Sequence, residues 1–254
     1  MRTDKKHLFI ILAVSVLLIL IILDFLDSDF NFHDILVEFH GLFFDLIVFG
    51  IILTLYENFD QKRNLIDYYN SLLVDLREWK DNKNGEKIFR ILGELNKLGA
   101  KKISISESYL NFEFDFSGLS NLKGSLFKMS NLMNSKFIGN DLRDSTFVLT
   151  RLDNSYFENV NFENSRISSC NMENAEFSNV NFKNVIFTSS IFASTKFKNC
   201  NFLNADLNNV IVHEENILET LKENGNTGIE WENYFIDKNE ISFNGIKQNT
   251  LKIK

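Results

Sequence analysis

The chain has 254 residues, of which 44% are hydrophobic, and a net charge of −7, and this length allows one or two domains. Its two cysteines and four histidines show no metal-ligand spacing, and the sequence has neither a phosphate-binding glycine loop nor a catalytic triad. We therefore expect no metal, no cofactor, no catalytic residue and no enzyme activity, and we expect Cys170 and Cys200 to be reduced, packed thiols.

The chain opens with an apolar segment, residues 8–26, that is long enough for a transmembrane helix. Ser15 is the only polar residue between Leu8 and Leu23. A basic stretch that includes Arg2 precedes the segment, as in a signal peptide, but no small-residue cleavage site follows it. We therefore expect a retained membrane helix.

A second apolar segment, residues 35–56, is also long enough to span a bilayer, although it contains charged residues. The loop between the two segments has no lysine or arginine, whereas basic residues lie before the first segment and after the second. Basic residues favour the cytoplasmic side of a membrane. The sequence therefore predicts that residues 1–56 form a transmembrane hairpin with both chain termini in the cytoplasm.

Asp45 lies in the middle of the second segment, where a carboxylate costs about 2.5–3.5 kcal/mol to insert. The helical face that carries Asp45 either packs against the first helix through Ser15 or faces a pore formed by several subunits. A pore requires an oligomer, because two helices cannot enclose one alone. The candidate pore-lining residues are Glu38, Asp45, Phe49, Ile52 and Tyr56.

Residues 57–102 are predicted to form a cytoplasmic linker of two helices. Apolar residues recur at helical spacing from Phe59 to Leu76, residues 81–85 break the pattern, and the second helix ends near Gly99. The linker is basic, which suits either anionic lipid headgroups or an anionic regulator such as a nucleotide or an oligonucleotide. Its candidate binding residues are Lys80, Lys83, Lys87, Arg90, Lys97, Lys101 and Lys102.

An apolar residue occurs at every fifth position from Leu122 to Val212 without a gap. A step of five scatters residues around an α-helix and alternates between the two faces of a strand, so neither element can bury this pattern. The chain must therefore turn a corner every five residues. In most repeats a small residue lies two positions before the apolar one, and asparagine, which tolerates left-handed turn geometry, most often lies two positions after it.

This pattern, with ADLNN at residues 205–209, resembles the pentapeptide-repeat family. The resemblance implies that residues 103–212 form a right-handed quadrilateral β-helix, a solenoid with four repeats per coil in which residues twenty apart stack in columns. The linker is similar to that of bacterial membrane-anchored pentapeptide-repeat proteins, which implies a location in the bacterial inner membrane. One predicted column is entirely aromatic and consists of Phe137, Phe157, Phe177 and Phe197.

The segments that flank the repeats carry their own signals. Residues 102–116, in which Phe112, Phe114 and Phe116 alternate with polar residues, are predicted to form a strand before the repeats. After the repeats, residues 213–254 are expected to form a cap or an oligomer contact. This tail should contain a helix that ends at Gly225 and a hairpin turn at Asn244-Gly245.

Outward positions of the repeats carry scattered apolar residues, which suit ordinary surface, a docked tail or a contact between subunits. The candidate oligomer contacts are Met133, Val148, Leu149, Ile186, Ile191 and Ile211. Between Leu122 and Val212 nine basic residues stand against eight acidic ones. This balance argues against the acidic, DNA-like rod with which some members of the family protect topoisomerases.

We expect an oligomeric channel or membrane-permeabilising effector whose cytoplasmic solenoid serves assembly or sensing. The resemblance to membrane-anchored repeat proteins implies a role in anti-phage defence beside a partner signalling enzyme. The expected partners are thus the lipid bilayer, further copies of the chain and an anionic regulator. The first alternative is a non-enzymatic, membrane-tethered scaffold that presents the solenoid to a protein partner, and the second is a DNA mimic that protects a topoisomerase.

Overall fold

The computed structural model of the chain divides into two compact units, Met1–Gln61 and Lys62–Lys254. The first predicted membrane segment, residues 8–26, lies outside the described residues except at four helical positions. The residues that the structure describes are 15, 18, 19, 22, 32–77, 82–110, 113–238 and 249–254.

Helix α2, Phe32–Asp75, contains the second predicted membrane segment and continues beyond it without a break. From Gly41 onward its most apolar stretch has no buried residue, and among the described residues it is the one helix long and apolar enough to cross a membrane. A helix with apolar residues on every side is typical of contact with lipid rather than with water. The described residues thus contain one candidate span where the sequence predicts a hairpin of two. Its exposed apolar side chains include Phe43, Phe44, Ile47, Ile51, Leu55 and Tyr56.

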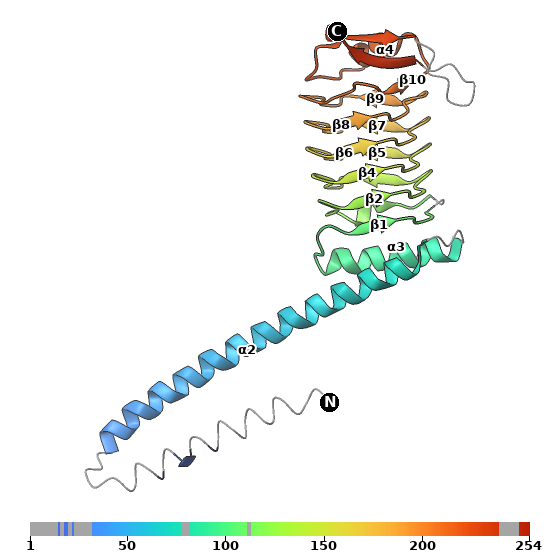
Figure 1. Cartoon of the computed structure of the whole chain (residues 1–254). Coiled ribbons are helices and arrows are strands. Elements are labelled where there is room, and N and C mark those ends of the chain that lie inside the picture. Colours follow the sequence, from blue (N-terminus) through green and yellow to red (C-terminus); the bar gives the residue numbers. More distant parts are fainter. Residues whose placement is uncertain are drawn as a thin grey trace. The chain divides into compact units, whose positions relative to one another are not determined.

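Helix α3, Asn82–Lys97, closes the first end of the solenoid (Figure 1). Residues 82–85, which the sequence assigns to a break between helices, form its first turn. Gly85 allows this turn to approach the solenoid, because a Cβ there would stand 3.0 Å from the carbonyl oxygen of Tyr109. The buried side of the helix carries Ile88, Ile91, Leu92 and Leu95.

The solenoid consists of short parallel strands stacked coil upon coil (Figure 1). Two of its sides are sheets, with the strand orders β1-β2-β4-β6-β8 and β3-β5-β7-β9. The other two sides are joined by isolated bridges, such as Asn161 with Asn181 and Asn171 with Ile191. Each coil therefore has four sides, which confirms the predicted pentapeptide-repeat solenoid. The strands are β1 (Ser104–Ser106), β2 (Leu126–Lys128), β3 (Lys136–Ile138), β4 (Thr146–Val148), β5 (Tyr156–Glu158), β6 (Arg166–Ser168), β7 (Glu176–Ser178), β8 (Ile186–Thr188) and β9 (Lys196–Lys198).

The corners of the coils lie where the sequence places them, two residues after each inward apolar residue. Every fifth residue from Gly124 to Asn209 has a positive φ. Asparagine occupies many of these positions because its short polar side chain tolerates the left-handed region. Met129 and Leu149 are departures from this rule, since each holds a φ of 53° without that advantage.

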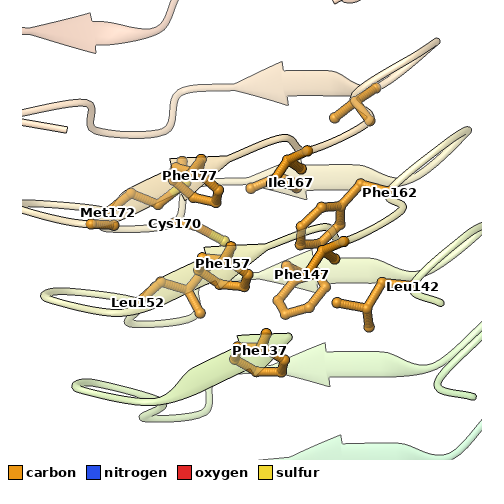
Figure 2. Packing of buried hydrophobic residues seen from close by; sticks show 14 of the residues in the cluster. Phe137, Leu142, Phe147, Leu152, Phe157, Phe162, Ile167, Cys170, Met172 and Phe177 are labelled. Carbon is orange, nitrogen blue, oxygen red and sulfur yellow. The ribbon is translucent and has the colours of Figure 1, made fainter. Parts of the chain in front are cut away.

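The core is a set of stacked columns inside the coils. Figure 2 shows the labelled Phe137, Phe157 and Phe177 in successive coils. The ring centroids of Phe137 and Phe157 lie 4.8 Å apart, and those of Phe157 and Phe177 lie 4.6 Å apart. Phe197 continues the stack at 5.0 Å. The predicted aromatic column is therefore confirmed, and it provides stacked aromatic contacts in addition to the burial of apolar surface.

The small residues that precede the inward apolar ones also lie inside the coils, where their hydroxyl groups need partners. Ser155 Oγ donates to the carbonyl oxygen of Leu132 at 2.9 Å, and Ser165 Oγ donates to that of Leu142 at 2.7 Å. Ser155 and Ser165 therefore each link one coil to the coil before it.

The first coil departs from the twenty-residue spacing of the later ones. Ile105 pairs with Phe127, 22 residues on, and Asp115 pairs with Lys136, 21 residues on. The 3-10 helix η1, Phe116–Gly118, accommodates part of the extra chain. Of the strand predicted for residues 102–116, β1 at Ser104–Ser106 is confirmed, whereas Phe116 leaves the extended conformation and stacks on Phe137 at 4.4 Å.

The C-terminal segment contains the predicted helix. Helix α4, Ile217–Glu223, is followed by Gly225 with a φ of 72°. Strands β10 (Ile211–Val212), β11 (Tyr234–Asp237) and β12 (Asn249–Ile253) form an antiparallel sheet in the order β10-β12-β11, and η2 (Trp231–Asn233) precedes β11. The proposed Asn244-Gly245 turn lies outside the described residues.

Buried asparagines mark both ends of the regular stack. Asn140 Nδ2 donates to the carbonyl oxygens of Phe116 and Leu119, at 2.7 and 2.8 Å. Asn226 Nδ2 donates to those of Phe197 and Leu221, at 3.1 and 2.8 Å. Each asparagine thus binds carbonyl groups where the chain leaves the coil spacing, as buried polar groups require.

Candidate functional site

A groove of about 540 Å³ lies between the last turns of α2 and helix α3. Its apolar wall is anchored in the core, since Leu72 and Leu76 pack on the buried cluster and Ile91 belongs to it. Tyr68 is 56% exposed, and its ring centroid lies 5.6 Å from that of Tyr69. This volume lies within the range of small-molecule sites. The lining residues are Tyr68, Tyr69, Leu72, Asp75, Leu76, Lys87, Arg90, Ile91 and Glu94.

The groove collects two of the seven basic residues predicted to bind an anion, Lys87 and Arg90. They are exposed, and Lys87 Nζ donates a long hydrogen bond of 3.3 Å to Asn84 Oδ1. The carboxylate of Glu94 pairs with Lys97 at 2.7 Å, and this hydrogen bond raises the pKa of the Lys97 ammonium. Of the remaining predicted residues, Lys80 lies outside the described residues, and Lys83, Lys101 and Lys102 are exposed but do not line the groove.

Sequence reasoning missed Tyr68, Asp75 and Glu94 as groove residues. Tyr68 lies next to an apolar stripe of α2, and a tyrosine there can equally well face solvent. It becomes a groove residue only because α3 packs nearby. The helical period places Lys87, Arg90 and Glu94 on one face of α3, and this was the signal that could have joined them.

The predicted pore-lining residues follow one face of α2. Asp45, Phe49, Ile52 and Tyr56 recur at intervals of four, three and four residues and are all exposed. The side chain of Glu38 lies outside the described residues. The structure thus places four of the five candidates on a common, exposed helical face.

The predicted oligomer contacts separate into two groups on the solenoid. In the early coils Met129 lies beside Val148, because its amide donates to the carbonyl oxygen of Val148 at 2.8 Å, and Met133 follows four residues further along the chain. Met129 and Leu149 are 52% and 54% exposed. In the later coils Ile191 forms a bridge with Ile211, and Ile186 lies on the outer face of β8.

The two cysteines have packing roles. Both are free and buried in small-residue positions inside the coils, as predicted. Burial raises the pKa of the Cys170 thiol to about 12 and that of Cys200 to about 11, so neither is a nucleophile at neutral pH. Within the described ranges no group of histidine, cysteine, aspartate and glutamate residues has the arrangement of a metal site.

Comparison with known protein families finds a match within the solenoid. The sequence profile of the pentapeptide repeats family matches residues 147–184, 155–192 and 175–213, with eight copies. The chain matches no curated protein.

Solved structures with similar coils come from several sources. A pentapeptide repeat protein from the thylakoid lumen of Arabidopsis thaliana shares 22% identity over 47% of this chain and 86% of its own, with a TM-score of 0.27. QnrB1, a plasmid-mediated fluoroquinolone resistance protein, shares 14% identity over 52% of this chain and 87% of its own, with a TM-score of 0.22.

HetL, a protein involved in heterocyst differentiation regulation in the cyanobacterium Nostoc, shares 11% identity over 43% of this chain and 83% of its own, with a TM-score of 0.15. Likeness at this level says nothing of function. The matched repeats, the four-sided coils and the left-handed corners agree, so residues 147–213 are pentapeptide repeats that form a β-solenoid.

Proposed function

We propose that this chain is a non-enzymatic scaffold that is tethered to a membrane and presents its pentapeptide-repeat solenoid to a protein partner. In this proposal α2 is one membrane span, residues 8–26 supply the second, and both termini face the cytoplasm of a bacterium. The observation that carries the proposal is the exposed apolar stretch of α2, which continues in the same helix into the unit that contains the solenoid.

The physical argument rests on how much apolar surface this stretch leaves unburied. Phe44, Leu55 and Tyr56 are 67%, 63% and 67% exposed, and the apolar window has no buried residue. In water such a helix would expose a continuous hydrophobic surface, whereas in a bilayer the same surface contacts acyl chains. The helix also satisfies its own backbone, as a span must, and Thr54 Oγ1 donates to the carbonyl oxygen of Gly50 at 2.8 Å.

Cell fractionation tests the tether. The full chain, expressed in bacteria, should remain in the membrane pellet after a carbonate wash. Ile47→Lys with Ile51→Lys should lower the membrane-bound fraction, because each lysine costs about 3 kcal/mol near the centre of a span. Ile47→Leu with Ile51→Leu should leave it unchanged. Recovery of the unaltered chain in the soluble fraction would contradict the proposal.

The channel or membrane-permeabilising effector expected from the sequence is the second candidate function. It is favoured by Asp45, a carboxylate on the exposed face of an otherwise apolar stretch, in line with Phe49, Ile52 and Tyr56. Such a residue faces a polar surface in preference to lipid, and copies of the helix around a common axis would provide one. The oligomer, the anti-phage role and the partner signalling enzyme belong to this candidate.

Ion flux from liposomes tests the second candidate. Purified protein should release potassium from loaded vesicles, and Asp45→Asn should reduce the preference for cations over anions because it removes the charge and retains the shape. Thr54→Ser, in the same helix, is the control and should leave this preference unchanged. Vesicles that stay sealed at every protein-to-lipid ratio would leave the scaffold as the function.

A further inference from the structure

The groove between α2 and α3 combines a fixed apolar wall with cations that are not engaged by acids. Leu72, Leu76 and Ile91 pack on the solenoid cluster, so this wall is part of the folded unit. Tyr68 and Tyr69 add aromatic surface with hydroxyl groups at its edge. A wall of this kind binds an apolar or aromatic group with little loss of order, because it is already formed.

The charges at the groove favour a compact anion. Among the described residues, neither Lys87 nor Arg90 has a carboxylate within ion-pair distance. Glu94 is neutralised by Lys97, which leaves Asp75 as the one carboxylate of the lining that opposes the two cations. Lysine and arginine together suit a phosphate group, to which a guanidinium can donate two parallel hydrogen bonds.

Asp75 limits the size of the anion. An exposed carboxylate at the groove repels a chain of phosphates, whereas it can accept a hydrogen bond from a hydroxyl group of the ligand. A single phosphate joined to a hydroxylated group and to an apolar or aromatic group satisfies the two cations, the carboxylate of Asp75 and the apolar wall. A long oligonucleotide does not, because its further phosphates would approach Asp75.

We propose that this groove binds a phosphate ester, with the phosphate at Lys87 and Arg90 and its apolar or aromatic part against Tyr68, Leu72 and Ile91. The inference goes beyond the membrane tether and does not depend on it, since every lining residue belongs to the unit Lys62–Lys254. The same chemistry occurs in a nucleoside monophosphate and in the headgroup of an anionic phospholipid, and the experiment separates these two sources.

Binding is measured on the full chain in neutral detergent, by calorimetric titration with adenosine monophosphate and, separately, with short-chain phosphatidylglycerol. One of the two probes should bind with saturation. Lys87→Glu with Arg90→Glu should weaken that binding at least about tenfold, because each cation supplies a charge-assisted contact. Tyr68→Ala should weaken it less, since it removes one wall of the groove and no charge.

The matched control is Lys128→Glu with Lys198→Glu, which changes the net charge equally at exposed lysines on β2 and β9. This control should bind like the unaltered chain, and all variants should unfold at the same temperature because the altered side chains are exposed. Equal weakening by both double variants would overturn the proposal in favour of general charge attraction. Failure of both probes to bind with saturation would also overturn it.

The two probes also identify the source of the ligand. Saturable binding of adenosine monophosphate alone would identify a soluble ligand, and binding of phosphatidylglycerol alone would identify a lipid. Either outcome supports the site, provided that the double variant at Lys87 and Arg90 loses the binding. A failed carbonate extraction test would reject the tether and leave this result standing.

Discussion

Phenylalanine has opposite surroundings in two regions of this protein. Phe44 in α2 is 67% exposed, whereas Phe157 in the solenoid is fully buried. The difference follows from how the apolar residues are spaced. In the solenoid the apolar residues that recur at a step of five all lie inside the coils. In α2 the apolar residues surround the helix, so no single protein surface could cover them. Apolar composition therefore predicts burial only when the period of the apolar residues places them on one face of the element.

The largest effect on stability should come from replacing a phenylalanine by alanine in the solenoid, and the same replacement in α2 is the comparison. Phe157→Ala should destabilise the solenoid by about 3–5 kcal/mol, because it leaves a cavity between Phe137 and Phe177. Phe44→Ala should leave the free energy of solenoid unfolding unchanged. Denaturant unfolding followed by circular dichroism measures both. Equal losses would mean that the exposed stretch of α2 is part of the solenoid core.

Glycine in α3 offers a second comparison, between a face that touches the solenoid and one that does not. Gly85→Ala should destabilise by about 1–3 kcal/mol, since the added methyl group would meet the carbonyl oxygen of Tyr109 at 3.0 Å and the ring of Phe114 at 3.3 Å. Gly93→Ala should stabilise by up to about 1 kcal/mol, because no atom lies within 4 Å and alanine favours helix. Thermal unfolding of the two variants checks the opposite signs, and a gain for Gly85→Ala would show that α3 is not held against the solenoid there.

The smallest effect concerns the corners. Leu149→Asn should stabilise the solenoid by about 1 kcal/mol, because a left-handed backbone is costly for leucine and easier for asparagine. Leu203→Asn is the control, since Leu203 is also exposed but has no positive φ. Chemical unfolding at two protein concentrations is the measurement. A loss of stability that grows with protein concentration would instead show that another copy of the chain covers Leu149.

Much of the solenoid was predictable because its rules are local. The apolar period fixed the inward residues, and the asparagines indicated left-handed corners, which the positive φ values at residues such as Asn154 and Asn174 confirm. The extra residues in the first coil were not predictable, because η1 depends on Phe116 reaching Phe137 and on Asn140 holding two carbonyl groups. Local alternation of phenylalanine there predicted that the strand continues to Phe116, where η1 forms instead.

The candidate site was predictable only in part. The basic character of the linker led to Lys87 and Arg90, but it gave them equal weight with Lys101 and Lys102, which do not line the groove. Nothing in the sequence joins Tyr68 to Arg90, because the two belong to helices whose relative placement is set by burial of Leu92 and Leu95.

By itself, the sequence determined the repeat, its inward residues, its corners and the apolar character of α2, since each depends on residues a few positions apart. Only the tertiary structure decided how the first coil begins, which side of α3 meets the solenoid, and that Tyr68 and Arg90 line one groove. These features depend on which surfaces, distant in the sequence, pack together, and the pattern of neighbouring residues does not determine that packing.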